Sequence, residues 1–360
     1  MTNNISDDNK SIEGLKIWKA IIPTVIGLLV VAYLLFRNFE EIDFSLLHFS
    51  YFAVLFLIIA FLMMFMRDFG YMLRLKILSS NQLTWRKCLR IIMLWEFTSA
   101  VTPSAVGGTT LATIYIWKEG LPIGKSTAIV IATSFLDELY FSIVFPIFLL
   151  CFPFKDLFPA NANVVYDNLL IFALIGYFVK LLWTCLMGYS IFFNPAFFAK
   201  LIKKLFNFKL LRRWLPLAEK MANEFEVSNS ELKNKKFKFW VKAFTASFVS
   251  WSARFFVLNF LLVAFIFVVN VEQHQLASFY NQLLIFARQF ILWIMMLVMP
   301  TPGASGFAEI VFSSYMKDLV SVKGYEIFLA FVWRIVTYYP YLLIGIIIVP
   351  KWLLKHYKRK

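Results

Sequence analysis

Six charged residues interrupt long apolar runs in this 360-residue sequence, and they are the side chains best placed to do chemistry. A charge inside an apolar membrane segment is costly, so it usually faces a cavity, a partner charge or a substrate. The pattern therefore predicts an intramembrane polar site that draws on Glu96, Asp137, Glu138, Arg288, Glu309 and Arg334.

Two of these residues have two interpretations each. Arg334 lies in the middle of its apolar run and needs an anion, either a lipid phosphate or a carboxylate such as Glu309 or Asp137, and a purely structural ion pair is the alternative. Glu309 follows Gly306 by three residues, in the first turn of an expected half-helix. A carboxylate there also stabilises the positive end of the helix dipole, so capping and function both stay open for Glu309.

Two stretches, 91–117 and 278–315, each contain Thr-Pro followed closely by glycine. Proline removes an amide donor and glycine lets the backbone turn sharply. Each arm of the first stretch has only about a dozen residues, or about 16–18 Å of helix, against a hydrocarbon core of about 30 Å. The sequence therefore predicts two re-entrant helical hairpins. Half-helices that start at their tips would aim free amides at an anion, aided by the hydroxyls of Thr109, Thr110 and Ser305.

The elements that must position these residues are membrane helices. The chain is 61% hydrophobic and 19% aromatic, and its apolar residues fall in blocks of about 20, the length of a membrane-spanning helix. We predict an all-α polytopic membrane protein with about six full transmembrane helices and the two hairpins in an inverted-repeat-like arrangement. The expected full spans are 17–36, 49–66, 126–152, 167–192, 243–269 and 325–349.

Basic residues set the expected orientation, because Lys and Arg concentrate on the cytoplasmic side. They gather after the second span, in the loop 194–242 and in the tail 351–360, whereas 38–48 and 270–277 contain none. We expect a cytoplasmic tail at 1–16, a membrane domain at 17–350 with the amphipathic cytoplasmic loop 194–242, and a basic cytoplasmic tail at 351–360. Within that loop, the pattern at 195–206 fits an interfacial helix, and an ordinary solvated connector is the alternative. The basic residues after the second span are Arg67, Arg74, Lys76, Arg86, Lys87 and Arg90.

An internal repeat agrees with this topology. Leu94-Trp95 followed by Thr102-Pro103 is similar to Leu292-Trp293 followed by Thr301-Pro302. Entry of the two copies from opposite sides would make them an inverted repeat, the arrangement by which transporters place a site near the membrane midplane.

Several other functions are disfavoured. The net charge of +15 lies beside the apolar blocks, which indicates contact with anionic lipid and not with nucleic acid. Cys88, Cys151 and Cys185 are far apart and the three histidines show no ligand spacing, so neither metal nor cofactor is expected. The sequence also lacks a nucleophile elbow and a phosphate-binding glycine loop, which argues against an enzyme with an aqueous domain.

Three segments resemble the signatures of the flippase-like family that includes the transmembrane region of lysylphosphatidylglycerol synthases. They are Thr102-Pro-Ser-Ala-Val-Gly-Gly108 with Gly120-Leu-Pro-Ile-Gly-Lys-Ser-Thr127, then Met299-Pro-Thr-Pro-Gly-Ala-Ser-Gly-Phe-Ala-Glu309, then Val332 to Gly345 with Arg334 and Tyr338. The resemblance covers about residues 50–350. The chain departs from the family at Thr109-Thr110, where many members have an acidic residue and an arginine, and at Asp137-Glu138, where many have Glu-Arg.

The resemblance implies a lipid flippase or transporter of an anionic or lipid-linked substrate in a bacterial cytoplasmic membrane. Its expected partners are membrane lipids, with a homo-oligomer or a partner lipid synthase as further candidates. The alternatives are a membrane-embedded headgroup transferase with Glu309 or Asp137 as base, and an accessory subunit of a separate lipid-modifying enzyme. The aminoacyl-transferring domain of the full synthases is not found in these 360 residues, so transport is favoured over catalysis. The expected substrate-binding residues are Thr102, Pro103, Gly107, Gly108, Thr109, Thr301, Pro302, Gly303, Ser305, Gly306, Glu309, Arg334 and Tyr338.

Overall fold

The structure is a computed structural model, and its described secondary structure is entirely helical. It describes residues 33, 48, 50–102, 104–158, 166–207, 232–269, 278–296, 307–320 and 325–357, with a few isolated positions between 208 and 231. In this part of the chain, six helices are long and apolar enough to cross a membrane. The expected span 17–36 lies outside the described residues except for Tyr33.

Helix α3 (Tyr51–Leu78) begins where the Ser50 side chain accepts a hydrogen bond of 3.1 Å from the amide of Ala53. It is longer than the predicted span 49–66. Arg67 and Arg74 lie within it and are buried, although their position after the predicted span suggested a basic cytoplasmic connection. That assignment was wrong, because these guanidinium groups face the protein interior, where carboxylates bind them.

Helices α4 (Trp85–Val101) and α5 (Ser104–Lys118) form a helical hairpin. The side chain of Lys87 donates a hydrogen bond of 2.6 Å to the carbonyl of Glu119, so the outer ends of the two arms lie together. The hydroxyls of Thr98, in the last turn of α4, and Tyr115, in the last turn of α5, are 2.7 Å apart. The predicted hairpin is therefore present as a fold; its entry into the membrane and return stays a prediction.

Four further helices contain or match predicted elements. Helix α6 (Ile123–Cys151), helix α8 (Tyr166–Phe192) and helix α11 (Phe237–Val269) correspond to expected spans, and α11 starts six residues earlier than predicted. Helix α9 (Pro195–Phe206) confirms the helix expected in the basic loop, although its place at a membrane surface stays a prediction.

The second predicted hairpin region contains α12 (Phe279–Met296) and the shorter α13 (Phe307–Tyr315), followed by the 3-10 turn η4 (Lys317–Leu319). A short helix, α7 (Phe154–Leu157), packs against the start of α12. Helix α12 is long enough by length and composition to cross a membrane, which the first arm of a re-entrant hairpin does not require.

The expected span 325–349 is two helices, α14 (Tyr325–Thr337) and α15 (Tyr339–Tyr357). Tyr338 lies in the turn between them. Pro340 explains the interruption, since proline has no amide hydrogen and its ring clashes with the carbonyl four residues earlier.

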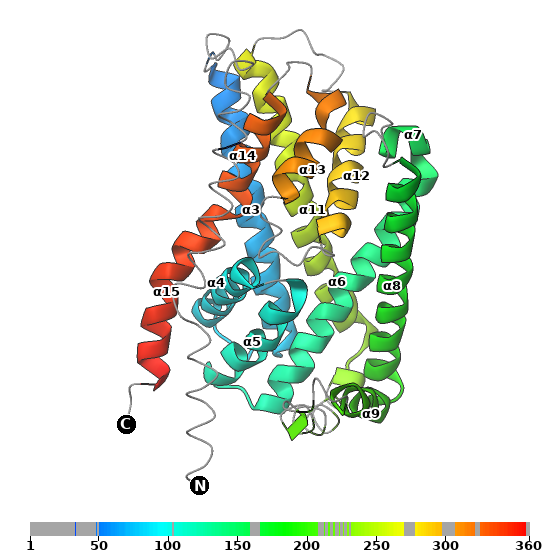
Figure 1. Ribbon diagram of the computed structural model, residues 1–360. Coiled ribbons are helices and arrows are strands. Elements are labelled where there is room, and N and C mark those ends of the chain that lie inside the picture. Colours follow the sequence, from blue (N-terminus) through cyan, green and yellow to red (C-terminus); the bar gives the residue numbers. More distant parts are fainter. Residues whose placement is uncertain are drawn as a thin grey trace.

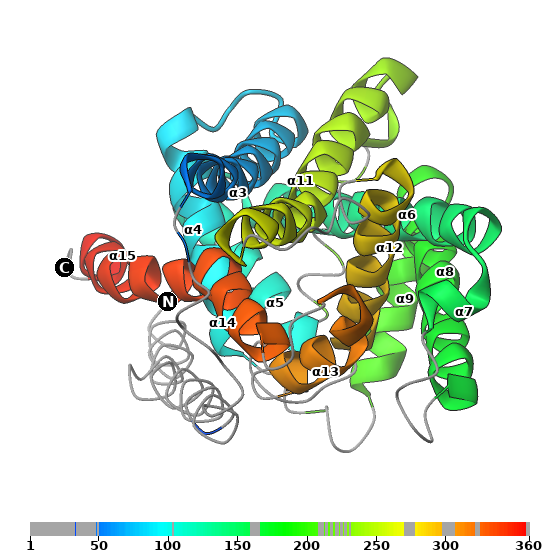
Figure 2. The ribbon, with the colours of Figure 1, turned by 90° about the horizontal axis from the view of Figure 1, so that it is seen from above.

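The long helices run along one axis of the molecule (Figure 1). The α4–α5 hairpin lies in the lower half of this view, and α12 and α13 lie in the upper half. Helices α3 and α11 lie side by side, as the view from above shows (Figure 2). Gly70 permits their close approach, because a Cβ atom there would lie 2.9 Å from the carbonyl oxygen of Ala246.

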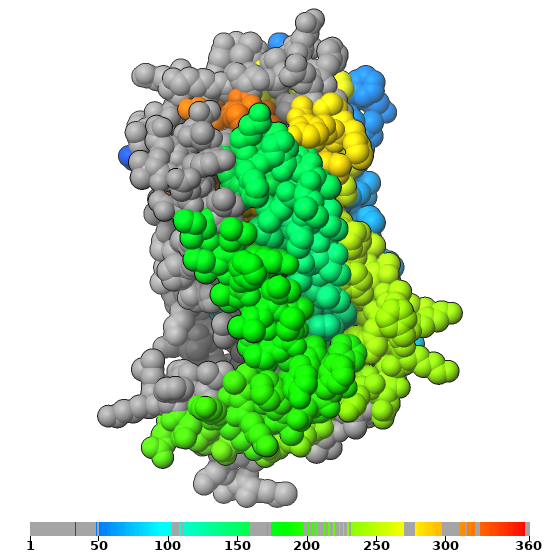
Figure 3. Space-filling model, turned by 90° about the vertical axis from the view of Figure 1, so that its right-hand side faces the viewer, coloured from blue at the N-terminus to red at the C-terminus, as the bar shows by residue number. Residues whose placement is uncertain are grey.

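Large apolar side chains cover the outside of the bundle. Figure 3 shows the face formed by α8, with parts of α6 and α11 beside it. Water would solvate such a surface poorly, whereas lipid chains match it, so we assign it to lipid contact. Residues of α8 that expose more than half of their surface are Ile171, Ile175, Phe178, Val179 and Leu182.

Candidate functional site

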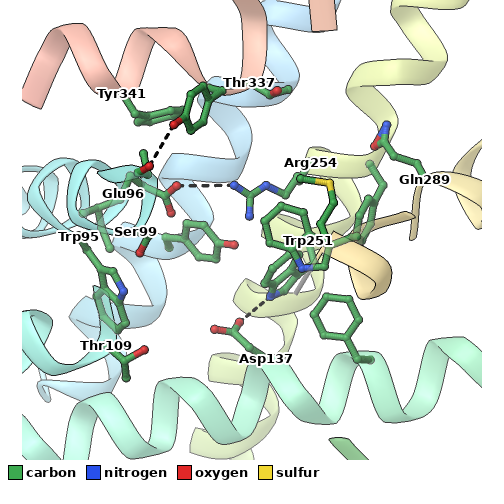
Figure 4. A pocket seen from close by; sticks show the side chains of 18 of the residues that line it. Trp95, Glu96, Ser99, Thr109, Asp137, Trp251, Arg254, Gln289, Thr337 and Tyr341 are labelled. Atoms are coloured by element: carbon green, nitrogen blue, oxygen red, sulfur yellow. Dashed lines mark hydrogen bonds and ion pairs between the residues drawn. The ribbon is translucent and has the colours of Figure 1, made fainter. Parts of the chain in front are cut away.

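A cavity of about 290 Å³ lies inside the helix bundle. Side chains from α3, α4, α5, α6, α8, α11, α12, α14 and α15 line it, and Figure 4 shows it from close by. Asp137, Lys180 and Arg254 reach it from near the centres of α6, α8 and α11. The cavity therefore lies about halfway along helices that are long enough to cross a membrane.

Charged groups of both signs face the cavity among tryptophan, tyrosine and phenylalanine side chains. Three of the predicted intramembrane charges that line it are carboxylates, and one is a guanidinium. The charged lining residues are Glu96, Asp137, Glu138, Arg74, Lys180, Arg254 and Arg334.

Glu96 on α4 is the centre of the first charge network. Its carboxylate binds the guanidinium of Arg67, which is fully buried, and lies 3.6 Å from Nη2 of Arg254 (Figure 4). Asp68 completes the network, 3.5 Å from Arg67, and accepts a hydrogen bond of 2.8 Å from the hydroxyl of Tyr341. The network connects α3, α4, α11 and α15 through charge and not through apolar contact.

Asp137 on α6 is the centre of a second network. It binds the guanidinium of Arg74 and accepts a hydrogen bond of 2.6 Å from the indole of Trp251 (Figure 4). Arg74 also donates to the hydroxyl of Ser247 at 2.9 Å. Asp137 accepts from donors on two other helices, so it anchors α6 to α3 and α11.

The third pair joins α6 to α8. The Lys180 ammonium lies 2.6 Å from a carboxylate oxygen of Glu138 and 4.6 Å from the ring centre of Phe141. A buried ion pair compensates the desolvation of both groups only while both are present, so each residue depends on the other.

Arg334 is buried and lines the cavity, and the anion predicted to bind it stays a prediction. Its guanidinium carbon lies 4.7 Å from the ring centre of Tyr338 and 5.3 Å from that of Trp333. Tyr338 also lines the cavity, and its hydroxyl donates a hydrogen bond of 3.0 Å to the carbonyl of Ala100. The break after α14 thus places the predicted Arg334 and Tyr338 beside the tip of the first hairpin.

The first hairpin supplies Thr102 and Thr109 to the cavity wall, and their predicted contact with a substrate stays a prediction. Gly108 packs against Ser99 of the other arm, where a Cβ atom would lie 3.2 Å from the Ser99 Cα atom. The side chain of Thr110 lies outside the described residues, as do Pro103 and any surroundings of Gly107. The role of Gly108 shown here is close packing of the two arms.

The tip of the second hairpin stays a prediction. Thr301, Pro302, Gly303, Ser305 and Gly306 all lie outside the described residues. Glu309 belongs to α13, but its side chain lies outside the description. The predicted meeting of the two tips is therefore neither confirmed nor contradicted.

Arg288 is buried away from the cavity lining, in a cluster that we call the Arg288 clamp. It forms two hydrogen bonds to the carboxylate of Asp318, of 2.5 and 2.7 Å. Its Nε donates to the carbonyl of Asp156 at 2.7 Å, and Nη1 lies 3.4 Å from that of Tyr315. This predicted intramembrane charge holds α7, α12, α13 and η4 together, and its neighbour Gln289 lines the cavity instead.

Four basic residues of the site were missed from sequence. Lys180 and Arg254 lie inside the apolar runs 167–192 and 243–269, so the rule that selected Arg334 would have found them. Arg67 and Arg74 lie seven residues apart, on one face of a helix, which was the signal that they belong to one interior surface.

The fold and the cavity define a multi-pass helical membrane protein with a buried, charged, aromatic-lined site. Residues 20–345 match the family model of the lysylphosphatidylglycerol synthase TM region, and the chain belongs to that family. This places it among membrane proteins of lipid metabolism.

The chain is also similar to a UPF0104 membrane protein of Archaeoglobus fulgidus. The two are 29% identical over 311 residues, which cover 84% of this chain and 88% of the relative. No solved structure matches the chain.

Proposed function

We propose that the protein moves a lipid with an anionic or lipid-linked headgroup across the membrane, and that the headgroup passes through the cavity. The observation that carries the proposal is the position of the cavity about halfway along helices long enough to span a membrane, with cations in its wall. A charged headgroup that crosses a bilayer needs a polar site within the membrane, because hydrocarbon does not solvate charge.

The charge pattern of the cavity supports an anionic cargo. Arg74, Lys180 and Arg254 reach carboxylates across helix interfaces, so each of these cations has a compensating charge within the protein. A headgroup phosphate would compete with those carboxylates for a guanidinium, the side chain whose planar fork suits phosphate best. Arg334, which closes the cavity from α14, would be a second such group.

The cavity size also supports transport of a headgroup and not of a whole lipid. A volume of about 290 Å³ is at the lower end of small-ligand sites and accommodates a phosphate with a small substituent. The acyl chains are therefore expected to stay in the bilayer while the headgroup crosses. The α4–α5 hairpin lies in the lower half of the molecule and α12 and α13 lie in the upper half (Figure 1), which suits exposure of the cavity to each side in turn.

Reconstitution tests this function. The purified chain is placed in phosphatidylcholine liposomes with a fluorescent phosphatidylglycerol, and transbilayer movement is followed by quenching of the outer leaflet. We expect movement with the natural chain and a loss of about tenfold or more in Arg334→Ala, since a charge-assisted hydrogen bond contributes about 1.5–3 kcal/mol. Arg86→Ala is the matched control, because Arg86 is exposed and lies away from the cavity.

Other outcomes identify the alternatives. A covalently changed lipid, detected by mass spectrometry, would establish a headgroup transferase. Activity only after addition of a lipid synthase would establish an accessory subunit. Equal movement in empty and protein-containing liposomes, with no partner effect, would remove the transport proposal.

A further inference from the structure

Arg254 has the most available hydrogen-bond donors of the cavity cations whose contacts are described. Its guanidinium carbon lies 4.3 Å from the ring centre of Trp293 and 5.2 Å from that of Trp251. Stacking against two indoles holds the guanidinium plane while its N–H groups stay free to bind a ligand. Figure 4 shows Arg254 extending from α11 across the cavity toward Glu96.

The ion pairing of Arg254 is weak compared with that of its neighbours. Across the described part of the chain, its one carboxylate contact is Glu96 at 3.6 Å, which is beyond hydrogen-bonding distance. Glu96 is already bound by Arg67. By contrast, the Lys180 ammonium lies 2.6 Å from its carboxylate partner. The Arg254 side chain is 15% exposed on the cavity, and its N–H groups donate no hydrogen bond within the described residues, so they can donate to a ligand in the cavity.

Gln289 provides independent evidence for a ligand site on the part of the cavity wall near Arg254. This residue lines the cavity, is 3% exposed, and its Nε2 has no hydrogen-bond partner among the described residues. An unsatisfied buried donor costs about 1–3 kcal/mol, so it usually marks a place where a ligand or water binds. Gln289 lies one helical turn from Trp293 on α12, so its amide and the Arg254 guanidinium border one surface.

We propose that Arg254 and Gln289 form a phosphate subsite, with Trp251 and Trp293 holding the arginine in place. The inference rests on the proposed function and gives it a specific ligand chemistry, a phosphodiester. Its two non-bridging oxygens accept hydrogen bonds from the Arg254 fork and from the Gln289 amide. When phosphate binds, Arg254 exchanges its long contact with Glu96 for direct hydrogen bonds. Glu96 keeps Arg67, so no carboxylate is left without a cation.

Binding measurements on the purified full chain in neutral detergent test the subsite. Three probes separate the sources of the phosphate: dihexanoyl-phosphatidylglycerol, dihexanoylglycerol without phosphate, and inorganic phosphate. Titration calorimetry gives the affinity of each, and thermal unfolding reports whether each variant is folded. The variants are Arg254→Gln, Arg254→Lys and Gln289→Leu, with Arg86→Gln as the matched control for loss of an arginine outside the cavity.

We expect dihexanoyl-phosphatidylglycerol to bind, and Arg254→Gln to weaken it by about ten- to one-hundredfold. Arg254→Lys keeps the positive charge but lacks the planar guanidinium, so its affinity should lie between those of the natural chain and Arg254→Gln. Gln289→Leu should weaken binding by about three- to tenfold while the melting temperature stays equal or rises, because it removes an unsatisfied buried donor. A structural role for Gln289 would lower the melting temperature, and Arg86→Gln should change neither quantity.

Natural affinity in both Arg254→Gln and Gln289→Leu would overturn the subsite, as would equal binding of dihexanoylglycerol. If Arg254→Gln does not fold, Arg254→Lys and Gln289→Leu decide the matter. Binding of inorganic phosphate but not of the phospholipid would support the subsite and remove lipid as its ligand. Phospholipid binding that depends on Arg254, without any transbilayer movement, would support the subsite and contradict the transport proposal. Transbilayer movement that is unchanged in the Arg254 variants would support transport and contradict the subsite.

Discussion

Arg288 and Arg254 are both intramembrane arginines on neighbouring helices, yet their surroundings differ. The Arg288 guanidinium donates from three nitrogens to Asp318 and to backbone carbonyls, so its hydrogen-bonding capacity is largely used within the protein. The Arg254 guanidinium stacks on two tryptophans and has only the long contact to Glu96 in the described part of the chain. A position inside the membrane region is therefore not enough to indicate that an arginine binds a ligand. The more useful sign is the number of its N–H groups that have no hydrogen-bond acceptor within the described protein.

The largest effect should follow from breaking the Arg288 clamp. Arg288→Ala removes every bond that joins Arg288 to α7, α13 and η4 and leaves Asp318 without its partner. We expect a loss of about 3 kcal/mol in the free energy of unfolding, measured by denaturant titration in detergent micelles, because several charge-assisted hydrogen bonds are lost while the exposed Asp318 carboxylate is solvated by water. Lys317→Ala, in the same turn but exposed, is the control. A variant as stable as the natural chain would contradict the structural role of Arg288.

Glu96→Gln tests the comparison by changing the carboxylate beside Arg254. The substitution removes the carboxylate that competes with a ligand for Arg254, so affinity for dihexanoyl-phosphatidylglycerol should rise severalfold. Arg67 keeps only Asp68, and the free energy of unfolding should fall by about 2 kcal/mol, below the cost expected for Arg288→Ala. Titration calorimetry checks the expected rise in affinity, and denaturant unfolding checks the expected fall in stability. Weaker anion binding would show that Glu96 positions Arg254 and does not compete for it.

The smallest effect is expected when an entire pair is replaced. Lys180→Met with Glu138→Gln removes both charges at similar volume, and buried pairs replaced in this way often cost little. We expect a change within about 1 kcal/mol in unfolding free energy and less than threefold in transbilayer movement.

Each single substitution of that pair should be more destabilising than the double variant, because it leaves one buried charge unpaired. A large loss of transport in the double variant with stability intact would instead add the pair to the substrate site.

Most of the fold could be predicted because lipid restricts what an apolar chain can do. Length and hydropathy located α6, α8 and α11, and Thr102-Pro103 followed closely by glycine located the α4–α5 turn. The boundaries of α3 could not be predicted in the same way. Arg67 and Arg74 resemble loop charges in a one-dimensional count, and only the fold brings Glu96 and Asp137 opposite them.

The candidate site was predicted in part for the same reason. Glu96, Asp137, Glu138 and Arg334 were recognisable as charges in apolar runs, and all four line the cavity. Which cation faces which carboxylate depends on how five helices pack, and that is not a local property of the sequence. Arg288 satisfied the same sequence rule and lies elsewhere, because that rule does not see hydrogen-bond partners.

The close contact at Gly70 has a mechanical consequence. Helices α3 and α11 meet there with little side-chain volume between them, so a shift of one past the other is sterically blocked. Together they carry Arg67, Arg74 and Arg254, whereas the opposing carboxylates Glu96 and Asp137 are on α4 and α6. If the bundle rocks during transport, we expect α3 and α11 to move as one rigid body. The ion pairs between their arginines and the carboxylates of α4 and α6 would then have to break and re-form in each transport cycle.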